Sequence, residues 1–182
     1  MAGPAWTTAA KGPVLGEDSL IFVAVGFHPR GFERLVRAMD SIAEKTEEEV
    51  VIQIGNTAYE PRFASYFRFK DSDAEIDELI GKARIVVSHS GVGCILKGLE
   101  QGKNVIVIPR MKSLGEHVDD HQSETAERFS HEGLVYVAQK VSEIESILLD
   151  GGKVRQVPDN PYSAERKRLL EALRSYIQFQ VT

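Results

Sequence analysis

Short apolar runs alternate with amphipathic segments along most of this chain. Residues 20–25 form the first apolar run, which ends at Gly26, and apolar residues then recur every three or four positions as far as residue 42. Continuous apolar runs of this length are typical of strands buried on both faces, and the wider spacing is typical of helices. The predicted strands cover residues 20–25, 50–54, 66–69, 85–87, 105–108 and 134–137. The predicted helices include residues 32–42, 76–80, 95–99, 118–130, 141–149 and 164–177.

This alternation predicts an α/β fold, Rossmann-like, with a parallel sheet covered by helices on both faces. Residues 1–18 are rich in Ala, Gly, Pro and Thr without periodicity, and we expect them to form a flexible leader. Residues 19–150 form the expected domain. Residues 151–182 are expected to form a linker and a C-terminal helix, which either packs on the same sheet or offers an apolar stripe to a partner.

Composition limits the classes of function. The chain has 182 residues, of which 42% are hydrophobic and 27% charged, as in a soluble globular domain. The formal net charge of −5 gives no reason to expect a nucleic-acid partner. The single cysteine, Cys94, excludes an internal disulfide and a multi-cysteine metal site. We find neither a membrane-spanning segment nor a secretory pattern, so the sequence predicts a cytoplasmic protein.

A strand, a small-residue turn and a helix follow one another in residues 83–96, and this arrangement favours phosphate binding. Gly91 and Gly93 lack a Cβ, and the first N–H groups of the next helix point into the turn. A simple strand-to-helix turn explains the same glycines, so both interpretations remain open. Ligands of parallel sheets bind beyond the carboxyl ends of the strands, where the segment 26–30, the turn at His89 and the segment 109–122 are expected to converge. The turn after the first strand resembles a dinucleotide-binding turn, but it lacks the G-x-G-x-x-G spacing, and the second strand is not followed by the acidic residue that binds ribose.

The segment from Gly115 to Gln122 is unusually polar. It is explained either as a solvated loop with Asp119 or Asp120 capping a helix, or as a binding site. His117 and His121 lack a clear third ligand for a metal ion. Carboxylates, imidazoles and an amide together offer mixed donors and acceptors, so we favour a hydroxyl-rich ligand such as a sugar.

Residues 21–31, 89–102 and 109–126 together resemble the C-terminal, donor-binding domain of glycosyltransferase family 28, and the similarity covers most of residues 20–150. It is closest to single-domain members, namely the soluble subunit of the dolichol-linked UDP-N-acetylglucosamine transferase and exopolysaccharide transferase subunits. The resemblance implies half of a GT-B fold and a metal-independent hexosyltransferase. It implies no cofactor, because the UDP-sugar is the donor substrate.

The resemblance also implies partners. A separate, membrane-anchored subunit would bind a lipid-linked acceptor and recruit this chain to the membrane surface. The hexose or N-acetylhexosamine of the UDP-sugar would be transferred to that acceptor. The alternative is a non-catalytic protein that binds a UDP-sugar or activates another transferase, and an unrelated nucleotide-binding module is a third interpretation.

By resemblance, the Gly26 turn lies near the diphosphate, the turn from His89 to Cys94 lies beneath the nucleotide, and His121 and Gln122 contact the donor hexose. Two positions depart from the family. Cys94 replaces the usual Ser or Thr, and Lys97 replaces a ribose-binding Glu. The candidate substrate-binding residues are Gly26, Phe27, His28, Arg30, His89, Ser90, Gly91, Val92, Gly93, Cys94, Lys97, Arg110, Glu116, Asp119, Asp120, His121 and Gln122.

The chemistry of transfer needs stabilisation of the leaving UDP and a base for the acceptor hydroxyl. Helix N-termini, with Arg30 or Arg110, are the candidates for stabilising UDP. His28 is a candidate base, although a role in shaping the turn explains it more simply. His89 is expected to position the turn or contact the ligand. We expect the base to lie in the partner subunit, which leaves the catalytic residue unassigned.

Overall fold

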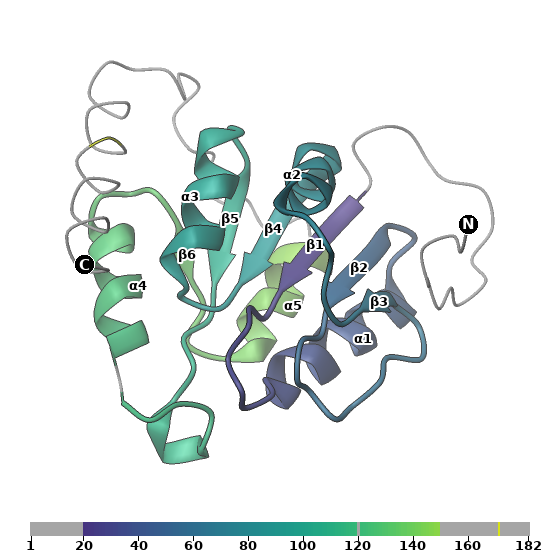
Figure 1. Ribbon diagram of the computed structural model, residues 1–182, viewed down its shortest axis with the longest axis horizontal. Coiled ribbons are helices and arrows are strands. Elements are labelled where there is room, and N and C mark those ends of the chain that lie inside the picture. The colour runs from purple at the N-terminus through teal and green to yellow at the C-terminus, as the bar shows by residue number, and fades with distance from the viewer. Residues whose placement is uncertain (1–19, 120, 150–170, 172–182) are drawn as a thin grey trace.

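Six parallel strands form a single sheet in the computed structural model, which describes residues 20–119, 121–149 and 171 (Figure 1). The order across the sheet is β3-β2-β1-β4-β5-β6, so the chain reverses its direction of winding between β1 and β4. The strands are β1 (Leu20–Ala24), β2 (Glu49–Gln53), β3 (Ser65–Phe67), β4 (Ala83–Ser88), β5 (Asn104–Val107) and β6 (Tyr136–Val137).

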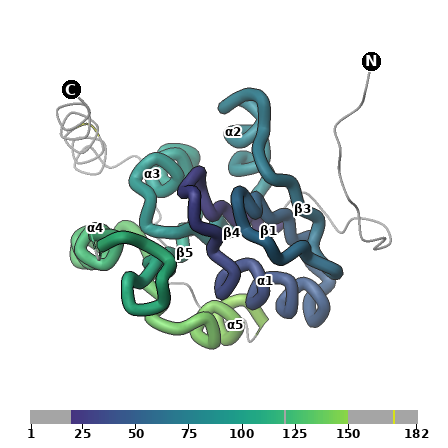
Figure 2. The backbone as a smooth tube through the Cα atoms, turned by 60° about the horizontal axis from the view of Figure 1, so that its bottom comes forward, coloured from purple at the N-terminus to yellow at the C-terminus, as the bar shows by residue number. Residues whose placement is uncertain are grey.

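Helices cover both faces of the sheet. Helices α1 and α5 pack on one face, and α2, α3 and α4 pack on the other (Figures 1 and 2). The helices are α1 (Glu33–Lys45), α2 (Asp73–Lys82), α3 (Val92–Glu100), α4 (His121–His131) and α5 (Val141–Leu149), with a 3-10 turn η1 (Lys112–Leu114). None of the helices in the described part of the chain is long and apolar enough to cross a membrane.

Strand β1 shows why the apolar runs are continuous. Its five residues are all buried, because their side chains alternate between the two helix layers. Ile21 and Val23 pack with α1 and α5, whereas Phe22 and Ala24 pack with α2 and α3. A strand covered on both faces requires apolar residues at every position, so the predicted Rossmann-like fold is confirmed.

Three predicted boundaries differ from the structure. The third strand is Ser65–Phe67 rather than 66–69. Helix α4 begins at His121 rather than at residue 118, and the Asp119 carboxylate accepts a hydrogen bond from the N–H of His121. The last strand contains only Tyr136–Val137, because the preceding Leu134 N–H donates to the carbonyl of Phe129 and closes the end of α4. The expected leader, residues 1–18, and the C-terminal segment, residues 151–182 with its helix at 164–177, lie outside the described residues, Glu171 excepted.

Candidate functional site

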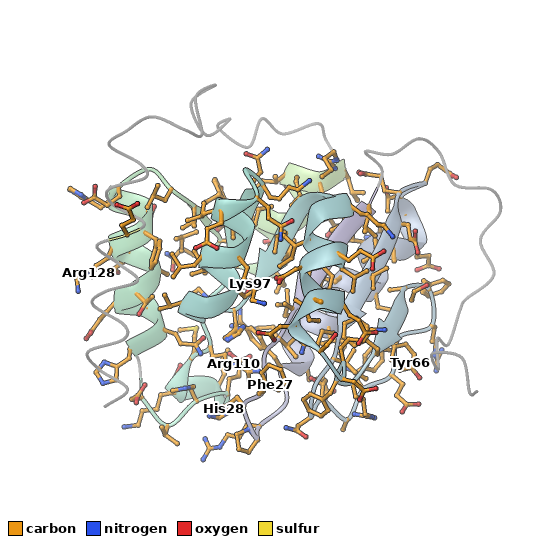
Figure 3. The ribbon with its side chains drawn as sticks, turned by 45° about the horizontal axis from the view of Figure 1, so that its top comes forward. Phe27, His28, Tyr66, Lys97, Arg110 and Arg128 are labelled. Atoms are coloured by element: carbon orange, nitrogen blue, oxygen red, sulfur yellow. The ribbon has the colours of Figure 1, made fainter. Side chains whose placement is uncertain are left out.

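Loops that follow β1, β4 and β5 meet at the carboxyl edge of the sheet, beside the reversal between β1 and β4. The Arg30 guanidinium donates to the carbonyls of Gly115 and His117, each at 3.2 Å, and so joins the first of these loops to the third. Figure 3 shows Phe27, His28 and Arg110 gathered at this edge, apart from Tyr66 and Arg128. The predicted convergence of these loops is confirmed.

Arg110 holds this edge together from beneath. Its side chain is 1% exposed, and its guanidinium donates to the carbonyls of Val25 at 2.9 Å, Arg30 at 3.0 Å and Gly31 at 2.8 Å. It also lies 4.6 Å from the centre of the Phe32 ring. Burial lowers the pKa of Arg110 to about 10, so the group remains charged at neutral pH. The buried guanidinium therefore positions the loops instead of lying on the surface that a ligand would meet.

Glu116 forms a second contact between loops and α1, an ion pair with Arg34, which was not predicted from the sequence. Its two carboxylate oxygens accept from Nε and Nη2 of Arg34, both at 2.9 Å, and one also accepts from the N–H of Met111 at 3.0 Å. Arg34 further donates to the carbonyl of Pro109 at 3.0 Å. These contacts occupy both oxygens of Glu116, and they fix the loop after β5 against α1.

His89 lies between two glycines. Its Nδ1 is 3.3 Å from the carbonyl of Ala24, which can only accept, so Nδ1 bears the proton and Nε2 is an acceptor. Burial lowers the pKa of His89 to about 4, so the ring is neutral at pH 7. A Cβ on Gly26, whose φ is +76°, would lie 2.5 Å from His89 Cε1, and one on Gly91 would lie 2.1 Å from Nε2. The His89 ring itself thus requires both glycines.

Gly93 and the start of α3 have a different environment. A Cβ on Gly93 would meet no atom within 4 Å. The helix begins at Val92, and its N-cap residue Gly91 provides no side-chain cap. The buried hydroxyl of Ser90 has no hydrogen-bond partner among the described residues. The first N–H groups of α3, at Val92 and Gly93, are therefore available to an anion. Cys94 packs against the core, and burial raises the pKa of its thiol.

Lys97 points its ammonium at α2. The Nζ atom lies 2.9 Å from Asp77 Oδ1 and 3.4 Å from Asp73 Oδ2. Burial opposes the charge, but the two carboxylates outweigh this effect and raise the pKa of Lys97. An Asp-Ser-Asp sequence, residues 71–73, lies between β3 and the start of α2, so the expectation that no such acidic motif follows a strand was wrong. No cluster of three or more His, Cys, Asp or Glu residues within the described ranges is arranged to hold a metal ion.

The polar segment after β5 is partly a helix cap. Asp119 Oδ1 accepts from the N–H of His121 at 3.2 Å, and it also lies 2.9 Å from His117 Nδ1. Gln122 Oε1 accepts from the N–H of Arg110 at 3.0 Å, while the His121 side chain is 76% exposed. Asp120 lies outside the described residues. The segment therefore combines the predicted capping contact with an exposed imidazole at the same edge.

His28 and Phe27 complete the edge. His28 Nδ1 accepts from the N–H of Arg30 at 3.2 Å, so the proton of the neutral ring is on Nε2, which is a donor. Burial and the nearby charge of Arg110 lower the pKa of His28. A neutral ring that offers N–H is a poor general base, so the geometry does not favour that role for His28. Phe27 is 70% exposed and stacks on Phe69, with 5.6 Å between the ring centres.

This chain is similar to known proteins in sequence and in fold. The human UDP-N-acetylglucosamine transferase subunit ALG13 is 33% identical over 130 residues, which are 64% of this chain and 11% of the human protein. The chain thus spans about a tenth of that relative. The solution structure of ALG13 matches 84% of this chain and 94% of its own, with 17% identity and a TM-score of 0.52.

Larger glycosyltransferases share the fold. The calicheamicin glycosyltransferase CalG4 matches 95% of this chain and 41% of its own, with 15% identity and a TM-score of 0.56. The described sheet and helices therefore correspond to one half of a GT-B glycosyltransferase. The glycosyltransferase family 28 C-terminal domain matches residues 20–178. This match covers most of the chain and shows that it belongs to the glycosyltransferase family 28 C-terminal domain family.

Proposed function

We propose that this chain is the donor-binding subunit of a UDP-sugar-dependent glycosyltransferase. The observation that supports this most directly is the start of α3, where uncapped N–H groups and the open side of Gly93 lie at the edge that the loops of β1 and β5 also form. Anions are stabilised at such a helix N-terminus, and a sugar diphosphate is an anion of the required kind.

The surrounding residues fit the rest of the donor. The exposed imidazole of His121 and the backbone-anchored amide of Gln122 lie where the loop after β5 enters α4, and we assign them to the hexose or N-acetylhexosamine. UDP-N-acetylglucosamine is the first donor to test, because the human relative is named a UDP-N-acetylglucosamine transferase subunit. The leaving UDP would be stabilised by the N–H groups of α3, with no cofactor and no metal ion.

The acceptor side requires a second half. CalG4 is more than twice as long as the part that matches this chain, and the relative ALG13 is called a subunit. We therefore propose that a membrane-anchored subunit binds a lipid-linked acceptor and recruits this chain from the cytoplasm to the membrane surface. Lys97 favours a second candidate role, that of a non-catalytic protein that binds the UDP-sugar. This lysine stands where the family resemblance implies a ribose-binding Glu, and its ammonium pairs with Asp77. A chain that binds UDP-sugar without supporting transfer would fit that role.

A pair of substitutions at Gly93 tests the donor site. Gly93→Asp adds a negative charge to the first turn of α3, where it favours the helix but repels a phosphate. Gly93→Asn is the neutral control of nearly the same shape. In calorimetric titrations of the full chain with UDP-N-acetylglucosamine, we expect Gly93→Asp to weaken binding about tenfold or more, the equivalent of about 1.4 kcal/mol, and Gly93→Asn to weaken it much less. Equal affinities for the two variants would contradict the proposed site.

Transfer separates the two proposed roles. We expect UDP release from UDP-N-acetylglucosamine when the chain is combined with membranes that contain its partner, and little release by the chain alone. Tight binding of the donor without any transfer in the presence of these membranes would favour the non-catalytic role instead.

A further inference from the structure

His117 and Asp119 form a hydrogen-bonded pair on the loop after β5. Nδ1 of His117 lies 2.9 Å from Oδ1 of Asp119, and the N–H of Asp119 approaches the same nitrogen at 3.4 Å. The shorter contact, to a charged oxygen, determines the tautomer, because a carboxylate can only accept. The proton of a neutral His117 is therefore on Nδ1, which leaves a lone pair on Nε2.

The Asp119 carboxylate is held in place as an anion. Burial would raise the pKa of Asp119, but the hydrogen bond from the N–H of His121 and the nearby imidazoles lower it. The same Oδ1 accepts from His121 N at 3.2 Å, so the start of α4 orients the carboxylate toward His117. A carboxylate in this position fixes the tautomer of a histidine and stabilises the imidazolium that forms when Nε2 takes up a proton.

The neighbouring ring of His28 has the opposite tautomer. The two ring centres are 4.7 Å apart, and His28 is neutral with its proton on Nε2 because the N–H of Arg30 donates to its Nδ1. His28 therefore does not compete with His117 for a proton. Three other charged or titratable groups surround the pair. Arg30 donates to the carbonyl of His117, and Nε2 of His121 lies 4.0 Å from Asp119 Oδ2. Arg110 is buried beneath the loop.

We propose that His117, oriented by Asp119, is the general base of the transfer reaction, so that this chain supplies the base that the sequence led us to expect in the partner subunit. This inference rests on the proposed function. The proton of the acceptor hydroxyl moves to Nε2 of His117 while the hydroxyl oxygen forms a bond to the anomeric carbon of the sugar. The bond from that carbon to the β-phosphate oxygen breaks, and its electron pair leaves with UDP. His117 then returns the proton to solvent.

The tautomers are a direct test of the premise. Nitrogen-15 spectra of the imidazoles in the full chain report which ring nitrogen holds the proton. We expect Nδ1–H for His117 and Nε2–H for His28 at neutral pH. In Asp119→Asn, the asparagine still caps α4, but it no longer offers an anion, so the Nδ1–H form of His117 should lose population. An Nε2–H tautomer of His117 in the unmodified chain would overturn the assignment.

Kinetics test the chemical role. UDP release from UDP-N-acetylglucosamine is measured with the full chain and membranes from its own cells, which supply partner and acceptor. We expect His117→Gln to lower kcat about 100-fold or more, with an unchanged Kd for UDP-N-acetylglucosamine. Asp119→Asn should also lower kcat, because the imidazolium that forms at His117 loses its carboxylate partner. His131→Gln, at the exposed end of α4, is the matched control and should have no effect.

The outcomes separate this inference from the proposed function. If the unmodified chain fails to bind UDP-N-acetylglucosamine, the proposed function is wrong, and the assignment of His117 as the base is then wrong too. If donor binding and transfer are normal in His117→Gln, the proposed function stands and the base lies elsewhere. If kcat falls only in proportion to donor affinity, His117 is a binding residue and the proposal is overturned.

Discussion

Replacing Gly91 by alanine tests whether the His89 ring dictates the shape of the turn before α3. The added Cβ would lie 2.1 Å from His89 Nε2 and 2.6 Å from Cε1. The ring cannot move away freely, because its Nδ1 is held by the carbonyl of Ala24 and the side chain is partly buried. Overpacking of this kind costs about 1–3 kcal/mol, so we expect Gly91→Ala to lower the free energy of unfolding by that amount.

Gly93→Ala is the matched control, because it makes the same chemical change two residues later. Nothing lies within 4 Å of its Cβ position, and the residue belongs to α3. Alanine is favoured over glycine in a helix by about 0.5–1 kcal/mol, so this variant should gain stability. The two free energies of unfolding should therefore differ by about 1.5–4 kcal/mol, the sum of the two effects.

Urea unfolding followed by circular dichroism measures this difference. In a double-mutant cycle, Gly91→Ala should cost much less in a His89→Ala background, because the ring that the Cβ meets is gone. A Gly91→Ala variant as stable as the unmodified chain would refute the reasoning. So would an equal loss of stability with and without the His89 ring.

Three other substitutions probe polar contacts in the fold and at the site. Asp40→Asn should lower the free energy of unfolding by about 1–3 kcal/mol at pH 7, because the buried carboxylate accepts from Tyr59 and three backbone N–H groups. Burial raises the pKa of Asp40, but the four hydrogen bonds outweigh burial and lower it. The stability that the carboxylate contributes is therefore lost as the pH falls below about 4. The difference in free energy of unfolding between the unmodified chain and Asp40→Asn should accordingly narrow in acid. Glu116→Gln should speed hydrogen exchange of residues 110–117, whereas Glu33→Gln, from an exposed Glu–Arg pair, should not. Lys97→Gln should cost less than about 1 kcal/mol, and still less in high salt, since this ion pair is partly exposed.

Local sequence patterns determined most of the fold. Strand β1 was predictable because a strand buried on both faces needs apolar residues throughout, and residues 20–25 supply them. The carboxyl-edge location of the site followed from the parallel order of the strands. The ends of helices and strands were harder to predict where a capping hydrogen bond determines them. Leu134 is apolar like a strand residue, but its N–H donates to the carbonyl of Phe129 and closes the end of α4.

Contacts between distant residues were not predictable from one sequence. Arg34 and Glu116 are 82 residues apart, and nothing in either local pattern indicates that they pair. Arg110 was a candidate for stabilising UDP, yet its guanidinium is buried and donates to carbonyls of the loop after β1. The sequence left Gly91 open to phosphate approach or to a simple turn, whereas the atoms nearest to its Cβ position are those of the His89 ring.

Mapping of the donor on the full chain by amide chemical shifts tests the central claim most directly. UDP-N-acetylglucosamine is titrated into the nitrogen-15-labelled protein, and the shifts of assigned amides are followed. The account predicts that the largest changes occur at the start of α3, at Val92 and Gly93, and in the loops 26–31 and 110–122, with the amides at the opposite edge of the sheet unchanged. Saturable binding with its largest shifts away from the carboxyl edge, or no shifts at millimolar donor, would contradict it.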